Sequence, residues 1–233
     1  MKGLHGGIII SCQSGPEEPL HGSIYMAAMA RAAAEGGAVA IRANGTADVA
    51  AICATVSLPV IGILKRHYPD SEVYITPTFE DARSVVTAGA RMIALDATPR
   101  RRPGGITLEA LVRQIHDELE VRVMADLSCL DDAVAAEAAG VDFLGTTLAG
   151  YVPHGRPATP VPDLDFISEL VHFSHTPVVA EGRFHEPQQV IEAFARGAYA
   201  VVIGGAVTRP QEITRRFVEA AITSKQGSAA HNT

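Results

Sequence analysis

The sequence predicts an α/β protein that folds as a single (β/α)8 TIM barrel. Short runs that are almost wholly apolar alternate with helix-like segments, a pattern typical of parallel strands covered on both faces. Eight such strand–helix units can be counted, and 233 residues is close to the length of one barrel. An open, doubly wound sheet is the alternative, but no Gly-x-Gly-x-x-Gly motif follows the first strand. We therefore expect one barrel domain over residues 1–222.

The expected strands are the apolar runs, which hold many β-branched residues and are bounded by turn or polar residues. They lie at residues 6–13, 38–42, 59–65, 92–98, 122–128, 142–147 and 177–183, and from residue 200 onward.

A helix is expected after each strand. The first has Ser23 as a candidate cap and stops at Gly36 and Gly37, and Asn44 and Gly45 turn the chain into the second. The expected helices lie at residues 22–35, 46–56, 80–88, 107–119, 130–139, 163–174, 187–196 and 210–222. Residues 223–233 are polar, and we expect them to form a disordered tail.

One segment departs from the alternation. Residues 74–78 resemble a strand, but too few residues separate them from Lys65 to form a helix. We expect a short excursion after the third strand and no ninth barrel strand.

The composition excludes several classes of protein. A net charge of −7 argues against general nucleic-acid binding, and no apolar run is long enough to span a membrane. The three cysteines lie far apart and show neither a disulfide framework nor metal-ligand spacing. The N-terminus lacks a signal-peptide pattern. We therefore expect a cytoplasmic protein.

Polar residues follow most of the expected strands, at the end where the sites of such barrels lie. Lys65 ends an otherwise apolar strand, so its ammonium should reach the barrel mouth. Nearby Arg42 or Arg66 and burial would lower its pKa, as a general base or a Schiff-base lysine requires. Phosphate binding by Lys65, or simple exposure to solvent, is the alternative. Glu181 is the complementary acid and Asp126 a third titratable group, whereas we expect Asp96 to form a structural ion pair.

The last two strands suit a phosphate group. Both end in small residues followed by charge, and glycines let backbone N–H groups approach phosphate oxygens at the start of a helix. Gly182, Gly204 and Gly205 fit this role, and Arg209 could bind the oxygens through two N–H groups. The alternative is that these glycines only make tight turns.

The nine histidines form no metal motif, so we expect no metal. His172 and His175 share a helix end without a matching carboxylate pattern, and His21, His67 and His154 are expected in loops.

Several long blocks together resemble the N-acylglucosamine-6-phosphate 2-epimerase family over residues 6–222. They include GGIIISCQ, AIRANG, PVIGILKR, IALDAT, MADLS, GTTLAGY, VVAEGR and VVIGGAVTRPQEIT. The resemblance implies a TIM barrel that interconverts N-acetylmannosamine 6-phosphate and N-acetylglucosamine 6-phosphate in sialic acid breakdown. It also implies a homodimer without metal or organic cofactor. The histidine at 67, the strongly basic loop at 99–105 and the longer tail depart from the family pattern.

The same resemblance assigns roles to individual residues. It places the catalytic lysine and glutamate at Lys65 and Glu181. The substrate-binding positions that it implies are Gln13, Arg42 and Asp126. We expect Thr146 and Arg183, at the ends of the sixth and seventh strands, to bind substrate as well. The phosphate-binding positions are Gly182, Gly204, Gly205 and Arg209, beside Arg183.

Two other functions fit the same residues. Lys65 could act as a Schiff-base nucleophile in another phosphosugar barrel, such as an aldolase. A phosphosugar-binding barrel without catalysis is the second alternative, although phosphate binding alone does not need the clustered acids.

Overall fold

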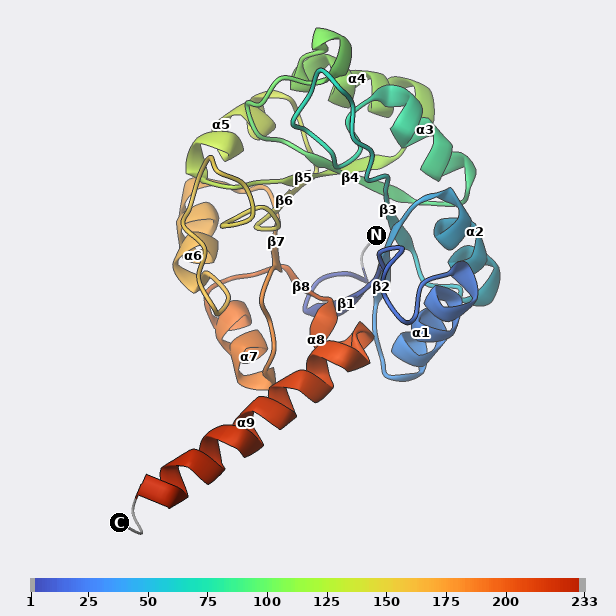
Figure 1. Ribbon diagram of the computed structural model, residues 1–233. Coiled ribbons are helices and arrows are strands. Elements are labelled where there is room, and N and C mark those ends of the chain that lie inside the picture. The colour runs from blue at the N-terminus through green and yellow to red at the C-terminus, as the bar shows by residue number, and fades with distance from the viewer. Residues whose placement is uncertain (1–2, 231–233) are drawn as a thin grey trace.

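The computed structural model describes residues 3–230, with side chains described as far as residue 223. Eight parallel strands close into a barrel in sequential order, and helices surround it (Figure 1). This confirms the expected single (β/α)8 barrel.

The strands are short and almost fully buried, as their apolar runs predict. Their bounds are β1 Gly7–Cys12, β2 Ala40–Asn44, β3 Val60–Ile63, β4 Met92–Asp96, β5 Arg122–Asp126, β6 Phe143–Gly145, β7 Val178–Glu181 and β8 Ala200–Ile203. Each strand pairs with its neighbours in the chain, and β8 closes the barrel on β1.

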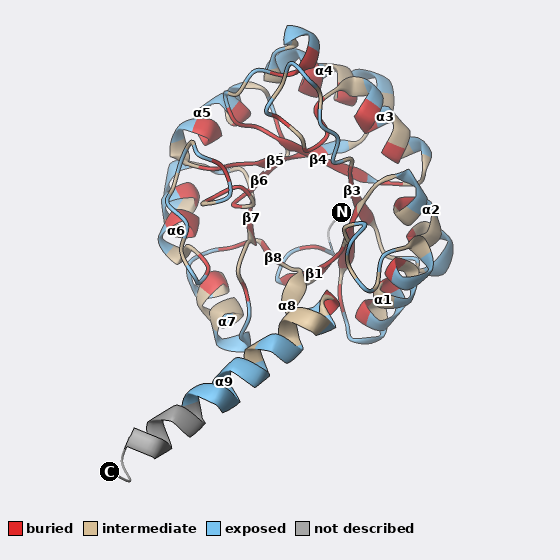
Figure 2. Cartoon of the chain, viewed as in Figure 1, coloured by how far each residue is buried: buried red, intermediate tan, exposed pale blue. Residues whose placement is uncertain are grey.

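The helices that surround the barrel, from α1 to α7, bury one face against it and expose the other (Figure 2). Their bounds are α1 Ser23–Glu35, α2 Thr46–Thr55, α3 Phe79–Thr87, the 3-10 turn η1 Pro103–Gly105, α4 Leu108–Leu119, α5 Leu130–Ala138, α6 Leu164–Phe173, α7 Pro187–Ala195, α8 Gly205–Thr208 and α9 Pro210–Ala230. The short α8 was not expected from the sequence, because it follows one glycine, Gly204, and begins with another, Gly205.

The helix α9 begins where expected but continues through most of the segment for which we expected a disordered tail. Residues 223–230 contain no proline, and the helix formers Lys225, Gln226, Ala229 and Ala230 let it propagate. The last three residues of the expected tail, 231–233, lie outside the described part. The helix projects away from the barrel instead of lying along it (Figure 1).

The expected excursion at residues 74–78 is confirmed as separate from the barrel sheet. Ile75 makes an isolated antiparallel bridge with Lys65, so the chain folds back over the end of β3. Thr76 has a positive φ of 45°, which is unfavourable for a β-branched residue. Three hydrogen bonds hold it: N–H to the Leu64 carbonyl (2.9 Å), hydroxyl to the Ala94 carbonyl (2.7 Å), and the Leu64 N–H to its hydroxyl (3.2 Å).

Strand alternation decides which side chains enter the barrel. One core cluster holds residues of a single parity from each strand, including Ile9, Ala40, Ile63, Met124 and Val179. Since successive side chains point to opposite faces, the residues two positions further along the strands also point inward. The inward layer at the carboxyl end therefore contains Ser11, Arg42, Lys65, Asp96, Asp126, Thr147, Glu181 and Gly204.

Candidate active site

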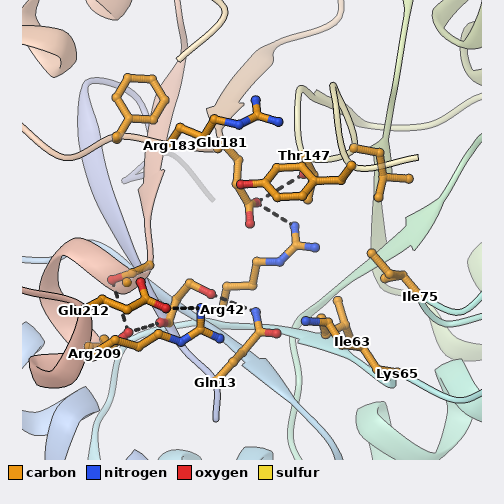
Figure 3. Close-up of a pocket in the computed structure, with 18 of the residues that line it drawn as sticks. Gln13, Arg42, Ile63, Lys65, Ile75, Thr147, Glu181, Arg183, Arg209 and Glu212 are labelled. Atoms are coloured by element: carbon orange, nitrogen blue, oxygen red, sulfur yellow. Dashed lines mark hydrogen bonds and ion pairs between the residues drawn. The ribbon is translucent and has the colours of Figure 1, made fainter. Parts of the chain in front are cut away.

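The carboxyl ends of the strands enclose a cavity of about 260 Å³ (Figure 3). It is lined by six of the side chains that the sequence analysis predicted at the site: Gln13, Arg42, Lys65, Glu181, Arg183 and Arg209. The expected phosphate-binding glycines, Gly182, Gly204 and Gly205, line it as well.

The buried arginine Arg42 organises one end of the cavity. Its two terminal nitrogens donate to the two carboxylate oxygens of Asp126, at 3.0 and 2.6 Å, and Nη1 also donates to Glu181 at 2.9 Å. The side chain of Arg42 is 1% exposed and that of Asp126 is fully buried. Burial works against the charge of Arg42, but Asp126 and Glu181 raise its pKa above the usual value. We refer to Arg42, Asp126 and Glu181 as the arginine–carboxylate cluster.

Thr147 connects the two acids of this cluster. Its hydroxyl is 2.7 Å from Asp126 Oδ1 and 3.2 Å from Glu181 Oε2. Burial raises the pKa of Glu181, and the Asp126 charge raises it further, while Arg42 opposes both effects. Glu181 can therefore hold a proton at a higher pH than an ordinary glutamate.

Lys65 follows β3 and lines the cavity (Figure 3). Hydrogen bonds hold the backbone here. The Lys65 N–H donates to the Asn44 side chain (2.8 Å), and the N–H of the next residue, Arg66, donates to the Tyr74 carbonyl (2.9 Å). Although water reaches part of the residue, the surrounding protein crowds the ammonium and lowers the pKa of Lys65, and Arg42 lowers it further. Among the described side chains Lys65 makes no ion pair. A larger fraction of this lysine is therefore neutral near neutral pH than of an ordinary one.

The opposite end of the cavity contains Gly204, Gly205 and Arg209. Gly204 is the N-cap of α8, and its carbonyl accepts from the N–H groups of Val207 and Thr208. The N–H groups of Gly205 and Ala206, at the start of the helix, have no helical partner. Arg209 Nε and Nη2 donate to the two carboxylate oxygens of Glu18, at 2.9 and 3.1 Å, and Nη1 donates to Glu212 at 3.3 Å.

Two carboxylates thus surround Arg209 where we predicted a phosphate. A Cβ atom on Gly205 would lie 2.3 Å from Glu212 Oε2, so this carboxylate sits directly against the glycine. Burial acts to raise the pKa of Glu18, but the Gly15 N–H and Arg209 hold it below its usual value. We refer to Arg209, Glu18 and Glu212 as the Arg209 latch. A phosphate entering here competes with both acids.

Two predicted substrate-binding residues do not reach the cavity. Thr146 is buried. Its hydroxyl donates to the Glu181 carbonyl at 2.8 Å and accepts from the Glu181 N–H at 2.9 Å. Asp126 lies behind Arg42 and holds it in place.

Arg183 has a positive φ of 59° and donates to the Ala149 carbonyl. Its guanidinium carbon lies 4.4 Å from the centre of the Tyr151 ring. As expected, Asp96 is a structural residue, bound to Arg100 at 2.5 Å and to Thr98.

Several cavity residues were missed by sequence reasoning. Thr147 could have been found from strand parity, since it shares the inward face of β6 with Phe143 and Gly145. Tyr74 and Tyr151 come from the excursion and from a long loop, and Glu212 lies in the first turn of α9. Glu18 does not line the cavity but binds Arg209 from a loop. No local signal places these four residues.

Comparison with known proteins agrees with the resemblance noted above. The family model described as "Putative N-acetylmannosamine-6-phosphate epimerase" matches residues 26–223. A putative N-acetylmannosamine-6-phosphate 2-epimerase of Enterobacter sp. is 49% identical over 219 residues, 93% of each chain. One of Caldanaerobacter subterraneus is 46% identical over 216 residues, covering 92% of this chain and 91% of the other.

Solved structures agree as well. A structure of the N-acetylmannosamine-6-phosphate 2-epimerase from Clostridium perfringens superposes with a TM-score of 0.91 at 44% identity, over 94% of this chain and 95% of that one. A thiamine phosphate pyrophosphorylase from Pyrococcus furiosus, at 18% identity and a TM-score of 0.56 over 87% of each chain, shares the fold.

Proposed function

The chain belongs to the putative N-acetylmannosamine-6-phosphate epimerase family, and we propose that it inverts C2 of an N-acyl amino sugar 6-phosphate. The reaction interconverts N-acetylmannosamine 6-phosphate and N-acetylglucosamine 6-phosphate during the breakdown of sialic acid and other amino sugars. The observation that supports it best is that a lysine with a lowered pKa, Lys65, and a glutamate with a raised pKa, Glu181, line the same cavity.

The chemistry explains why both groups are needed. The hydrogen on C2 becomes acidic only when C1 is an aldehyde, so the sugar ring opens first. Neutral Lys65 then removes the C2 proton, and the resulting ammonium stabilises the negative charge that develops on O1. Return of a proton to the opposite face of C2 inverts the carbon. Glu181 assists ring opening or exchanges protons on that second face.

Arg42 supports this chemistry by its fixed charge. Asp126 holds its guanidinium through two hydrogen bonds, so little reorganisation is needed when negative charge appears in the substrate. Gln13, whose side chain donates to Ser11 at 2.7 Å, adds a polar group to the same wall. These steps are proton transfers by the chain's own residues and call for no cofactor.

The phosphate binds at the other end of the cavity. Gly204, Gly205 and Arg209 would contact its oxygens, with Gly182 and Arg183 on the adjoining wall. A dianion has the charge to displace Glu212 from Gly205 and to compete with Glu18 for Arg209. Binding energy from this remote group holds C2 beside Lys65.

Proton NMR of N-acetylmannosamine 6-phosphate with the enzyme in D₂O tests the reaction class. Epimerisation with deuterium entering at C2 is expected. Binding of the sugar without turnover would favour a binding protein instead.

Borohydride treatment separates proton transfer from Schiff-base chemistry. We expect no irreversible sugar adduct on Lys65. An adduct at this residue would show that Lys65 acts as a nucleophile, as in an aldolase.

We further propose that the enzyme is a cytoplasmic homodimer. All three cysteines are free thiols, which suits a reducing compartment. No helix in the described part of the chain is both long and apolar enough to cross a membrane. The projecting α9 exposes Phe217 (74%), Val218 and Ile222, apolar surface that a second copy can cover. Sedimentation velocity of the full chain, against a variant with Phe217→Ser, tests the dimer.

A further inference from the structure

A partly exposed cysteine, a buried aspartate and a half-exposed histidine meet beside the barrel mouth, outside the cavity. Cys129 is the N-cap of α5, Asp132 lies in the first turn of that helix, and His154 comes from the loop between β6 and α6. One ligand-type atom from each lies within 4.8 Å of the other two. The mechanism above uses none of the three side chains. We propose that they bind a zinc-like divalent cation.

The separations fit a tetrahedral ion. With Zn–S of about 2.3 Å, Zn–N of about 2.05 Å and Zn–O of about 2.1 Å, tetrahedral geometry requires S···N of about 3.6 Å and N···O of about 3.4 Å. The observed separations are 3.6 Å between Cys129 Sγ and His154 Nε2, and 3.2 Å between His154 Nε2 and Asp132 Oδ1. These two separations match the tetrahedral values, and the Cys129 sulfur and an Asp132 carboxylate oxygen lie within 4.8 Å of each other.

The hydrogen bonds of Asp132 leave the required oxygen available. Its Oδ2 accepts from the Ser128 N–H (2.7 Å), the Ser128 hydroxyl (2.6 Å) and the Cys129 N–H (3.2 Å). Its Oδ1 contacts only His154 among the described groups. The three donors fix the carboxylate, as supporting hydrogen bonds do for metal ligands.

Charge and access are also suitable. A Cys129 thiolate and the Asp132 carboxylate together neutralise a divalent cation. The Cys129 thiol releases its proton when the ion binds. The side chain of His154 is 41% exposed, which leaves the fourth corner open to a water molecule.

The loop that carries His154 is anchored to Ser128 directly after this histidine. The next residue, Gly155, packs so closely on Ser128 that a Cβ atom would lie 2.5 Å from its hydroxyl oxygen. The Arg156 N–H donates to the Ser128 carbonyl at 3.0 Å, and its side chain binds Asp163 at 2.5 Å. No metal motif is visible in the sequence because His154 is 25 residues from Cys129, and these anchors bring the two together.

The ion has a structural role. The same loop supplies Leu148 and Tyr151 to the wall of the cavity. An ion held by Cys129, Asp132 and His154 ties this loop to α5, so it holds that wall in place without touching the substrate.

Cobalt titration tests the site directly. Metal-free full-length protein without an affinity tag is titrated with Co²⁺, and the thiolate-to-cobalt charge-transfer band in the near ultraviolet is recorded. We expect the band to saturate at about one equivalent per chain and to disappear when Zn²⁺ is added, because zinc usually binds N/O/S sites more tightly. Proton release of about one per ion is expected in weakly buffered solution near pH 8.

Matched variants assign the band. Cys129→Ser should abolish it, whereas Cys53→Ser, which alters another partly exposed thiol, should leave it unchanged. His154→Gln changes a half-exposed side chain and should weaken Zn²⁺ binding by at least about tenfold while leaving the far-UV circular dichroism unchanged. Absence of the band in the wild-type protein, its survival in Cys129→Ser, or unchanged Zn²⁺ affinity in His154→Gln would each overturn the proposal.

Discussion

The two ends of the cavity are built in opposite ways. In the arginine–carboxylate cluster, Arg42 is 1% exposed and bound by two acids that strand alternation aims inward. In the Arg209 latch the arginine is 34% exposed, and its acids come from a loop and from the first turn of α9. The first end is fixed before substrate arrives, whereas the second holds its arginine with carboxylates that a phosphate can replace. Under the proposed function, the rigid end carries the chemistry and the adaptable end captures the substrate.

The largest expected effect concerns the chemical end. Lys65→Met should abolish exchange at C2 while the fold stays intact, because it removes the base but keeps a long side chain. Loss of a positioned general base costs on the order of 10²–10⁴ in rate. Deuterium incorporation followed by NMR measures the loss, with circular dichroism as the control. A variant that keeps half of the wild-type turnover would refute the assignment.

The second prediction compares the two arginines by stability. Arg42→Met leaves Asp126 and Glu181 without their buried partner and should lower the free energy of unfolding by about 3–5 kcal/mol. Arg209→Met should lower it by less than about 1 kcal/mol, because its ion pairs are partly exposed to water. Urea unfolding of both variants measures the difference, and equal losses would mean that the two ends do not differ in rigidity.

The third prediction concerns substrate capture. Arg209→Ala should lower kcat/KM for the phosphorylated sugar. The loss should correspond to about 2–4 kcal/mol of transition-state stabilisation, the range for a truncated charge pair. Unphosphorylated N-acetylmannosamine should be a very poor substrate, and its residual activity should barely change. If both sugars lose kcat/KM equally, Arg209 is a structural residue and the proposed phosphate site is wrong.

The smallest effect should come from the acid that occupies the proposed phosphate position. Glu212→Gln removes a negative charge that competes with the phosphate at Gly205, so KM for the phosphorylated sugar should fall, by up to about tenfold for one exposed charge contact. The kcat value should stay close to that of the wild-type enzyme. Glu219→Gln, further along α9 and outside the cavity, is the matched control. A rise in KM would show that Glu212 helps to hold the phosphate site together.

The barrel could be predicted from sequence because its signal is local and repeated. Each apolar run and each helix-like segment reports its own structure, and eight repeats determine the closure. Position within the site follows a finer rule: parity along a short strand. In β6 the inward positions are Phe143, Gly145 and Thr147, and the Thr147 side chain lines the cavity. The predicted substrate-binding residue, Thr146, lies one position away and therefore points outward.

The parts that sequence could not supply depend on contacts between distant segments. Glu18 reaches Arg209 across 191 positions of the chain, and nothing near either residue indicates the pairing. The course of α9 away from the barrel is equally unmarked, since its sequence reports a helix but not its direction.

The chain between Lys65 and Ile75 folds back after β3 as a hairpin-like loop, and this loop has a consequence for protein engineering. Its base is held by the Lys65–Ile75 bridge and by the hydrogen bonds of Thr76, whereas Pro69 and Asp70 at its tip are exposed. Exposed loop tips tolerate insertions best, and here the tip is separated from the base by a paired stem. A peptide tag or a fluorophore-labelled cysteine can therefore be grafted between Pro69 and Asp70, placing a reporter near the barrel mouth without moving the backbone of Lys65.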